Sequence, residues 1–160
     1  MGISANLFYR TDNCDECLDW RIRPTNEQYD AQKERWNDLA DFLLPKLREY
    51  TGFPTRSWLQ GSYKFGTQIR PAKSGQEFDI DLGLYFLWEG KPTDNDWNAK
   101  KLKNQVQIAL EEYIDDNNND SDAVSAPKTR CNRIHFSDDF HIDVPSYHLN
   151  PETDVRSLAT

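Results

Sequence analysis

The segment 78–88, FDIDLGLYFLW, constrains the fold of this chain more than any other. Bulky apolar residues occupy every second position from 78 to 86, which is the period of a β-strand with one face in a core. The opposite face carries Asp79 and Asp81, whose side chains project roughly 6–7 Å apart. Strands are depleted in aspartate, and two like charges at this distance raise each other's pKa. The pair therefore indicates a cation between the two carboxylates.

A third carboxylate suggests what such a cation does. Asp143 lies in the segment 140–149, FHIDVPSYHL, which shows the same apolar alternation. Magnesium takes oxygen ligands and keeps room for water and substrate phosphates. If the two segments lie side by side, the three acids complete a site for two metal ions, one activating a hydroxyl and the other holding a triphosphate.

A Gly-Ser turn in the segment 59–67, LQGSYKFGT, predicts a phosphate site. Gly61 lets the backbone approach a phosphate closely, and amides at the start of a brief following helix point toward an anion. The Ser62 hydroxyl can add a hydrogen bond. Each motif alone is a weak signal. Their order is more specific: an apolar strand, Gly-Ser, a polar connector, the double-Asp strand and a distant Asp strand.

This order resembles the nucleotidyltransferase fold of the DNA polymerase β superfamily. Within it, QGSYKFGTQIRP, EFDIDLGLYF and HIDVPSYHL together resemble the bacterial cyclic-oligonucleotide synthases related to cyclic GMP–AMP synthase, the CD-NTases. The resemblance spans about residues 55–160. It implies that the catalytic and metal-binding residues are Asp79, Asp81 and Asp143. It also implies that the nucleotide-binding residues are Gln60, Gly61, Ser62 and Tyr63.

The resemblance also implies an activity. Two Mg²⁺ ions, with Mn²⁺ as an alternative, would support the joining of ATP, GTP or pyrimidine triphosphates into a cyclic di- or trinucleotide for anti-phage signalling, with operon-encoded regulatory proteins as partners. Relatives continue into a helical second lobe, and we expect residues 1–160 to be the catalytic lobe alone. Two alternatives stay open: a non-catalytic module that binds a nucleotide or partner, and a minimal enzyme that adds AMP to a protein or RNA.

The composition excludes other classes. The 160 residues fit one domain, and a net charge of −8 argues against a passive nucleic-acid binder. We find no signal peptide and no apolar run of the roughly 20 residues that cross a membrane, so we expect a cytoplasmic chain without membrane contact. Cys14 and Cys17 form one Cys-x-x-Cys, far from Cys131, and we interpret all three as ordinary reduced thiols rather than as half a zinc site or a redox pair.

The remaining pattern predicts a mixed α/β (α+β) fold, a palm-like twisted sheet with helices packed on one face. One helix covers 26–50, is kinked or divided at Pro45 and ends near Gly52. A second runs from a cap at Asp94 or Asp96 to about residue 114. Strands are expected at 7–9, 56–60, 78–88, 129–136 and 140–149, the last two as an antiparallel hairpin.

Several other polar residues have two interpretations each. His141 shares a face with Asp143 and either tunes that carboxylate or is structural, whereas His135 and His148 are interpreted as structural. Tyr63 and Tyr85 either line the pocket or, as we favour, pack in the core or at its rim. Five basic residues either meet phosphates or solubilise the surface, with Arg133 the strongest phosphate candidate: Lys64, Arg70, Lys73, Arg130 and Arg133.

Overall fold

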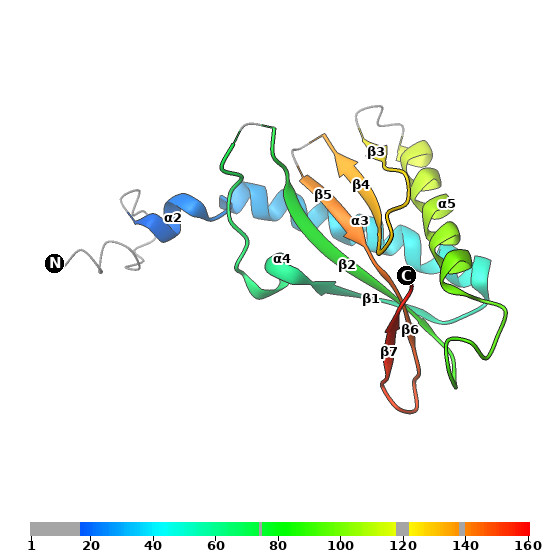
Figure 1. Cartoon of the computed structure of the whole chain (residues 1–160). Helices are drawn as coiled ribbons and strands as arrows, with labels where there is room; N and C mark the ends of the chain where they lie inside the picture. Colours follow the sequence, from blue (N-terminus) through cyan, green and yellow to red (C-terminus); the bar gives the residue numbers. More distant parts are fainter. Residues whose placement is uncertain (1–16, 74, 118–121, 138–139) are drawn as a thin grey trace.

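The computed structural model describes residues 17–73, 75–117, 122–137 and 140–160 (Figure 1). In chain order its elements are α2 (Leu18–Ile22), α3 (Asn26–Thr51), β1 (Thr55–Gln60), α4 (Gly61–Phe65), β2 (Phe78–Leu87), α5 (Ala99–Asn117), β3 (Ala123–Val124), β4 (Asn132–Phe136), β5 (Phe140–Val144), β6 (Ser146–Leu149) and β7 (Arg156–Leu158). The expected strand at 7–9 and Cys14 lie outside the described residues, and Cys17 is buried.

The long strand β2 organises the sheet, into which the seven described strands are joined. On one side β2 pairs antiparallel with β1. On the other side its first half pairs parallel with β5 and its second half with β6. The strand β4 pairs antiparallel with β5, which confirms the predicted hairpin, while β3 and β7 extend the two ends.

The expected single strand 140–149 is interrupted at Pro145. Proline has no N–H to donate to a neighbouring strand, so the ladder breaks there. The register is nevertheless kept, because Phe78 faces Phe140 and Leu84 faces Ser146, the same offset along the chain. The Leu84 amide donates to the Pro145 carbonyl at 2.9 Å, which holds β5 and β6 along one line beside β2.

The core lies between one face of the sheet and the helices α3 and α5. In Figure 1, α3 passes behind the sheet, and α5 lies at a steep angle to α3 near the C-terminal end of α3. The alternating apolar residues of β2 point into it, and each is at most 5% exposed. From α3 it receives Leu39, Leu43 and Leu47, all fully buried. This confirms the mixed α/β class with helices on one face, and it leaves the acidic face of β2 free of helices α3 and α5.

In helix α3 the predicted end at Gly52 is confirmed, but the helix is continuous through Pro45 because tertiary packing outweighs the effect of the proline. Thr25 and Gln28 form a capping box at its start, and Gly52, at a φ of 75°, ends it as predicted. The helix is not divided at Pro45. Burial of Leu43 and Leu47 on either side of the proline offsets the lost backbone hydrogen bond, because tertiary packing supplies most helix stability.

The cap predicted for α5 was wrong. The Asn98 side chain accepts a hydrogen bond from the Lys101 amide at 3.0 Å and so caps the helix, which begins at Ala99. Asp94 instead accepts from the Lys91 amide and closes the preceding turn. None of the helices in the described ranges is long and apolar enough to span a membrane.

Candidate active site

The register of the sheet brings the three predicted acids to one place. On the face of β2 opposite α3 and α5, Asp81 lies directly across from Asp143 of β5, and Asp79 lies across from His141. On the other side of β2, Gln60 at the end of β1 faces Asp81. Asp81 and Asp143 are half-buried, whereas the Asp79 side chain is 52% exposed. The acids therefore lie at the junction of three strands, open to solvent on one side.

The Gly-Ser turn packs directly on this acidic face. Gly61 has a φ of 61°, a left-handed conformation that side chains rarely adopt. A Cβ at this position would lie 2.0 Å from Oδ2 of Asp81, far inside van der Waals contact. Two separate reasons therefore require glycine at this position: the left-handed backbone conformation, and the space that the Asp81 carboxylate occupies. Ser62 follows at the start of α4, as predicted.

The side chain of Gln60 is fixed by two stacked tyrosines. Its amide nitrogen donates to the Tyr85 hydroxyl at 2.6 Å, and its oxygen accepts from the Tyr147 hydroxyl at 3.1 Å. The two rings stack with centroids 4.8 Å apart. Gly83 makes room for this arrangement, because a Cβ there would lie 2.5 Å from the Gln60 amide nitrogen. The Gln60 amide is therefore oriented before any ligand binds.

Tyr63 points elsewhere. Its ring is 4% exposed, stacks on Tyr29 with centroids 4.9 Å apart, and accepts a hydrogen bond from the Trp36 indole at 3.2 Å. Burial raises the pKa of its hydroxyl. This packing agrees with the prediction that Tyr63 lies in the core. Its described contacts are with Tyr29 and Trp36, and not with the three aspartates.

Arg133, one of the five basic candidates, forms an ion pair with one of the acids. It lies opposite Asp143 in the β4–β5 pair, and its guanidinium donates to both carboxylate oxygens, from Nη2 to Oδ2 at 2.7 Å and from Nε to Oδ1. Burial raises the pKa of Asp143, but the hydrogen bonds and charge of Arg133 outweigh it and hold that pKa below its usual value. Of the other candidates, Arg70 donates to backbone carbonyls of Arg23 and Trp20, and Lys64 lies over the Trp58 ring.

Asp81 has the opposite electrostatic character. Burial, together with the charges of Asp79 and Asp143, raises its pKa above the ordinary value. A carboxylate in that position is stabilised by a bound cation. Repulsion by the other two acids, which the sequence predicted, is thus one of the causes of the raised pKa of Asp81.

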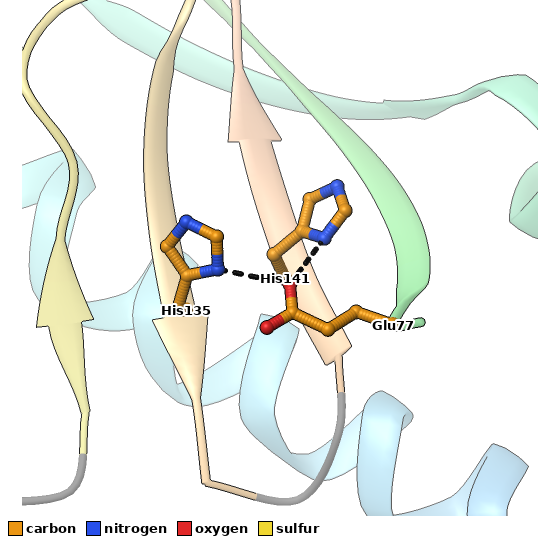
Figure 2. A group of neighbouring side chains, drawn as sticks. All are labelled: Glu77, His135 and His141. Atoms are coloured by element: carbon orange, nitrogen blue, oxygen red, sulfur yellow. Dashed lines mark hydrogen bonds and ion pairs between the residues drawn. The ribbon is translucent and has the colours of Figure 1, made fainter. Parts of the chain in front are cut away.

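A glutamate that the motif analysis missed joins the site to two histidines (Figure 2). Oε2 of Glu77 accepts from Nδ1 of His141 at 2.8 Å and from Nδ1 of His135 at 2.9 Å. The other ring nitrogen of His141, Nε2, lies 2.9 Å from Oδ1 of Asp79. Because 77, 79 and 81 share one parity, extending the alternation by two residues would have placed Glu77 on the acidic face.

His141 therefore has Asp79 and Glu77 as its direct partners, and not Asp143, the carboxylate that its place on β5 suggested. Burial lowers the pKa of His141, but its contacts with Asp79 and Glu77 outweigh burial and raise it. The pKa of Glu77 is raised by burial and lowered more strongly by the two histidines, so that it lies below its usual value. His148 is structural as predicted: its Nε2 lies 3.0 Å from the Trp88 carbonyl in the core.

Two groups of side chains in the described part of the chain have the spacing to hold a metal ion. Ligand atoms within 4.8 Å of one another are offered by Asp79, His141 and Asp143, and separately by Glu77, His135 and His141. Asp81 belongs to neither group as these side chains stand. The carboxylates suit Mg²⁺, and the imidazoles extend the donor set to nitrogen. The residues present thus fit a divalent cation.

Comparison with known proteins places this geometry in a family. A family model described as "Cyclic GMP-AMP synthase DncV-like, nucleotidyltransferase domain" matches residues 55–147. A cyclic GMP-AMP synthase of Escherichia albertii is 31% identical over 157 residues, 98% of this chain and 34% of that protein. A c-di-GMP synthase of Roseivirga ehrenbergii is 26% identical over 141 residues, 84% of this chain and 35% of that protein. The chain spans about a third of the length of these relatives.

Solved structures share the fold. Vibrio cholerae DncV in its 3′-deoxy ATP bound form superposes with a TM-score of 0.77 at 20% identity, over 94% of this chain and 54% of that one. Escherichia coli DncV in its 3′-deoxy GTP bound form gives 0.74 at 20% identity, over 95% and 55%. With the family match covering more than half of its residues, this chain belongs to the DncV-like nucleotidyltransferase family of the cyclic GMP-AMP synthases.

Proposed function

We propose that this chain forms the catalytic lobe of a nucleotidyltransferase that joins nucleoside triphosphates into a cyclic di- or trinucleotide. One observation carries the proposal: the β2–β5 register, which sets Asp79, Asp81 and Asp143 on one face beside the Gly61 turn. The names of the relatives, cyclic GMP-AMP synthase and c-di-GMP synthase, support this class of product.

We infer ATP, GTP or pyrimidine triphosphates as the substrates. One Vibrio cholerae DncV structure holds the linear intermediate 5′ pppA(3′,5′)pG, which contains both adenosine and guanosine. In the reaction that we propose, the hydroxyl of one nucleotide attacks the α-phosphate of another, a P–O bond forms and pyrophosphate leaves. A second such step within the linear dinucleotide closes a cyclic dinucleotide, and a cyclic trinucleotide needs one more nucleotide to be added before the ring closes.

The three aspartates would hold two Mg²⁺ ions, with Mn²⁺ as the alternative. When bound, such ions lower the pKa of an attacking hydroxyl and neutralise the charge of the triphosphate. The raised pKa of Asp81 supports this role, because that carboxylate lies in a setting where a bound cation is stabilising. Arg133 neutralises Asp143 from the side away from β2 and keeps its carboxylate ionised.

The turn after β1 would receive the phosphates. Because Gly61 has no side chain, a phosphate can approach the backbone next to Asp81. The Ser62 hydroxyl can donate a hydrogen bond to a phosphate oxygen. Tyr85 and Tyr147 use one N–H and one lone pair of the Gln60 amide. One N–H and one lone pair therefore stay available for a nucleotide.

Turnover of labelled ATP and GTP with Mg²⁺ or Mn²⁺ tests the proposal, using the protein at its full encoded length. We expect a cyclic product that is lost when Asp79→Ala is combined with Asp81→Ala. A matched variant, Asp115→Ala with Asp116→Ala, removes two exposed acids from α5 and should keep the activity. Unchanged turnover in the Asp79 and Asp81 variant would reject the mechanism.

The same experiment separates the alternatives. A thermal shift with nucleotide and Mg²⁺ but no product points to a non-catalytic binding module. Mass spectrometry that finds AMP attached to a protein or RNA, with no free cyclic product, points to a minimal nucleotidyltransferase. We place the activity in the cytoplasm, where its triphosphate substrates are made. The anti-phage setting and the operon-encoded partners rest on the family resemblance alone.

A further inference from the structure

The main chain of Asp79 lies beyond the end of its neighbouring strand. Strand β1 pairs with β2 only as far as Asp81. The Leu87 amide donates to the residue before β1, and the Leu84 amide donates to the residue before β6. Because successive residues of a strand direct their main-chain polar groups to opposite sides, the odd-numbered residues of β2 face the β1 side. The Asp79 carbonyl therefore needs a hydrogen-bond partner that β1 does not supply.

Gln68 supplies this partner from the loop after α4. Its Nε2 donates to the Asp79 carbonyl at 3.0 Å and to Oε1 of Gln32, on α3, at 3.0 Å. A main-chain carbonyl only accepts hydrogen bonds, so the orientation of both side-chain amides is determined. Gln68 is 7% exposed and Gln32 is 1% exposed, which strengthens these bonds by excluding water. The main chain of Asp79 is thus attached to helix α3 through Gln68.

The loop that carries Gln68 is itself fixed on both sides. The Thr67 amide donates to the Ser62 carbonyl at 2.9 Å, and the amide and side chain of Arg70 donate to carbonyls of the segment before α3. The loop also lines a cavity of about 550 Å³ whose wall includes Ser62, Gln68 and Asp79. Gln68 therefore lies between the proposed phosphate turn and one of the proposed metal ligands.

The carboxylate of Asp79 depends on this attachment, because its own side chain is 52% exposed and few neighbouring atoms hold it. The path of the main chain then decides where the carboxylate lies relative to Asp81 and Asp143. We infer that Gln68 is a positioning residue, which sets through the Asp79 carbonyl how tightly the three acids bind a divalent cation. The inference rests on the proposed function for the identity of the cation site.

Two methionine variants separate the two hydrogen bonds of Gln68. Methionine resembles glutamine in length and flexibility but has no donor. Gln32→Met removes only the bond between the two side chains, whereas Gln68→Met removes that bond and the bond to Asp79. Both should lower the melting temperature. Only Gln68→Met should also weaken Mn²⁺ binding, by about tenfold, because loss of groups that orient metal ligands costs about 10- to 100-fold in affinity.

The EPR signal of free Mn²⁺ measures this affinity in the protein at its full encoded length, without nucleotide. The temperature is one at which circular dichroism shows the wild-type protein and the variants folded. In turnover assays, the Mg²⁺ concentration that gives half the maximal rate should rise about tenfold in Gln68→Met. The KM for ATP at saturating Mg²⁺ should stay unchanged, because no contact with the nucleotide is removed.

A double variant, Gln32→Met with Gln68→Met, keeps the test decisive if Gln68→Met alone unfolds. Replacing both partners of a buried hydrogen bond by apolar groups of similar shape is nearly neutral for stability. The replacement also removes Nε2 of Gln32 and Oε1 of Gln68, two buried atoms that have no hydrogen-bond partner among the described residues. The double variant should therefore regain stability and still bind Mn²⁺ about tenfold more weakly than the wild-type protein.

The possible outcomes distinguish this inference from the proposed function. Equal Mn²⁺ affinity in Gln68→Met and Gln32→Met, or wild-type affinity in the double variant, overturns the positioning role and leaves the proposed function intact. A wild-type protein that binds no Mn²⁺ overturns both. Weakened Mn²⁺ binding in Gln68→Met, with no turnover by the wild-type protein, supports the positioning role and rejects the proposed activity.

Discussion

Replacing Gly61 by alanine tests whether the glycine turn and the Asp81 carboxylate occupy one continuous space. The new methyl group would start 2.0 Å from Oδ2 of Asp81, whereas ordinary contact begins near 3.4 Å. The carboxylate or the turn must therefore move by more than about 1 Å. Such a shift would change both the stability of the chain and the position of a proposed metal ligand.

Two separate costs set the expected magnitude. A left-handed φ costs a residue with a Cβ about 1–2 kcal/mol, and Gly61 has a φ of 61°. Overpacking against the Asp81 carboxylate costs about 1–3 kcal/mol more. The free energy of unfolding should thus fall by roughly 2–5 kcal/mol. Displacement of Asp81 should also lower turnover by about 100-fold, as for other 1 Å misplacements near a reaction centre.

Gly66→Ala is the matched control for the assay. Gly66 has a φ of 64°, but nothing lies within 4 Å of the position that a methyl group would take there, so only the backbone cost of about 1–2 kcal/mol applies. Urea unfolding in EDTA gives the free energies. The double variant with Asp81→Ala completes a mutant cycle, because removal of the carboxylate should reduce the cost of Gly61→Ala to that of Gly66→Ala.

Equal losses of stability in Gly61→Ala and Gly66→Ala would refute the reasoning. The same conclusion follows if Gly61→Ala costs as much in the Asp81→Ala background as in the wild-type chain. Either result would mean that the turn and the carboxylate are independent, and that the glycine serves only the backbone.

Three further changes test the electrostatics and the helix cap. In EDTA at neutral pH, Asp81→Asn should raise the free energy of unfolding, because burial raises the pKa of Asp81 in the folded chain and so makes its charged form destabilising. The gain should vanish below pH about 4, where the carboxyl group is protonated in the unfolded chain as well. Arg133→Gln should cost about 1–3 kcal/mol at pH 7. That loss should shrink in denaturation curves as pH falls through the folded pKa of Asp143, which lies below its usual value. Asn98→Ala should lower the melting temperature through loss of about 0.5–2 kcal/mol, whereas Asp96→Ala should leave it unchanged.

Local patterns predicted the elements well wherever one period dominated. The alternation of 78–86 and the helical spacing of Leu39, Leu43 and Leu47 each indicated the observed element and its buried face. Where several local signals competed, prediction failed. Four Asp and Asn side chains precede α5 at positions 94, 95, 96 and 98. Only the path of the loop decided that Asn98, and neither Asp94 nor Asp96, caps the helix.

The neighbours of each site residue could not be read from spacing. Glu77 lies in a polar connector and shows no motif of its own, yet it binds two histidines from β4 and β5. The sequence paired His141 with Asp143, two positions along its strand. In a parallel pair its closer partner is Asp79, directly opposite on β2, because cross-strand neighbours lie nearer than the next side chain on the same face.

The sequence by itself determined that a strand would carry two acids on the face away from its core, with a glycine turn before it and a third acidic strand after it. These features are local, since side-chain alternation and backbone freedom act within a few residues. Only the tertiary structure decided that Asp81 would face Asp143 and that Arg133 would neutralise Asp143. It also decided that His141 would contact Asp79. Register between distant strands depends on how the whole apolar set packs on α3 and α5, and no short segment contains that information.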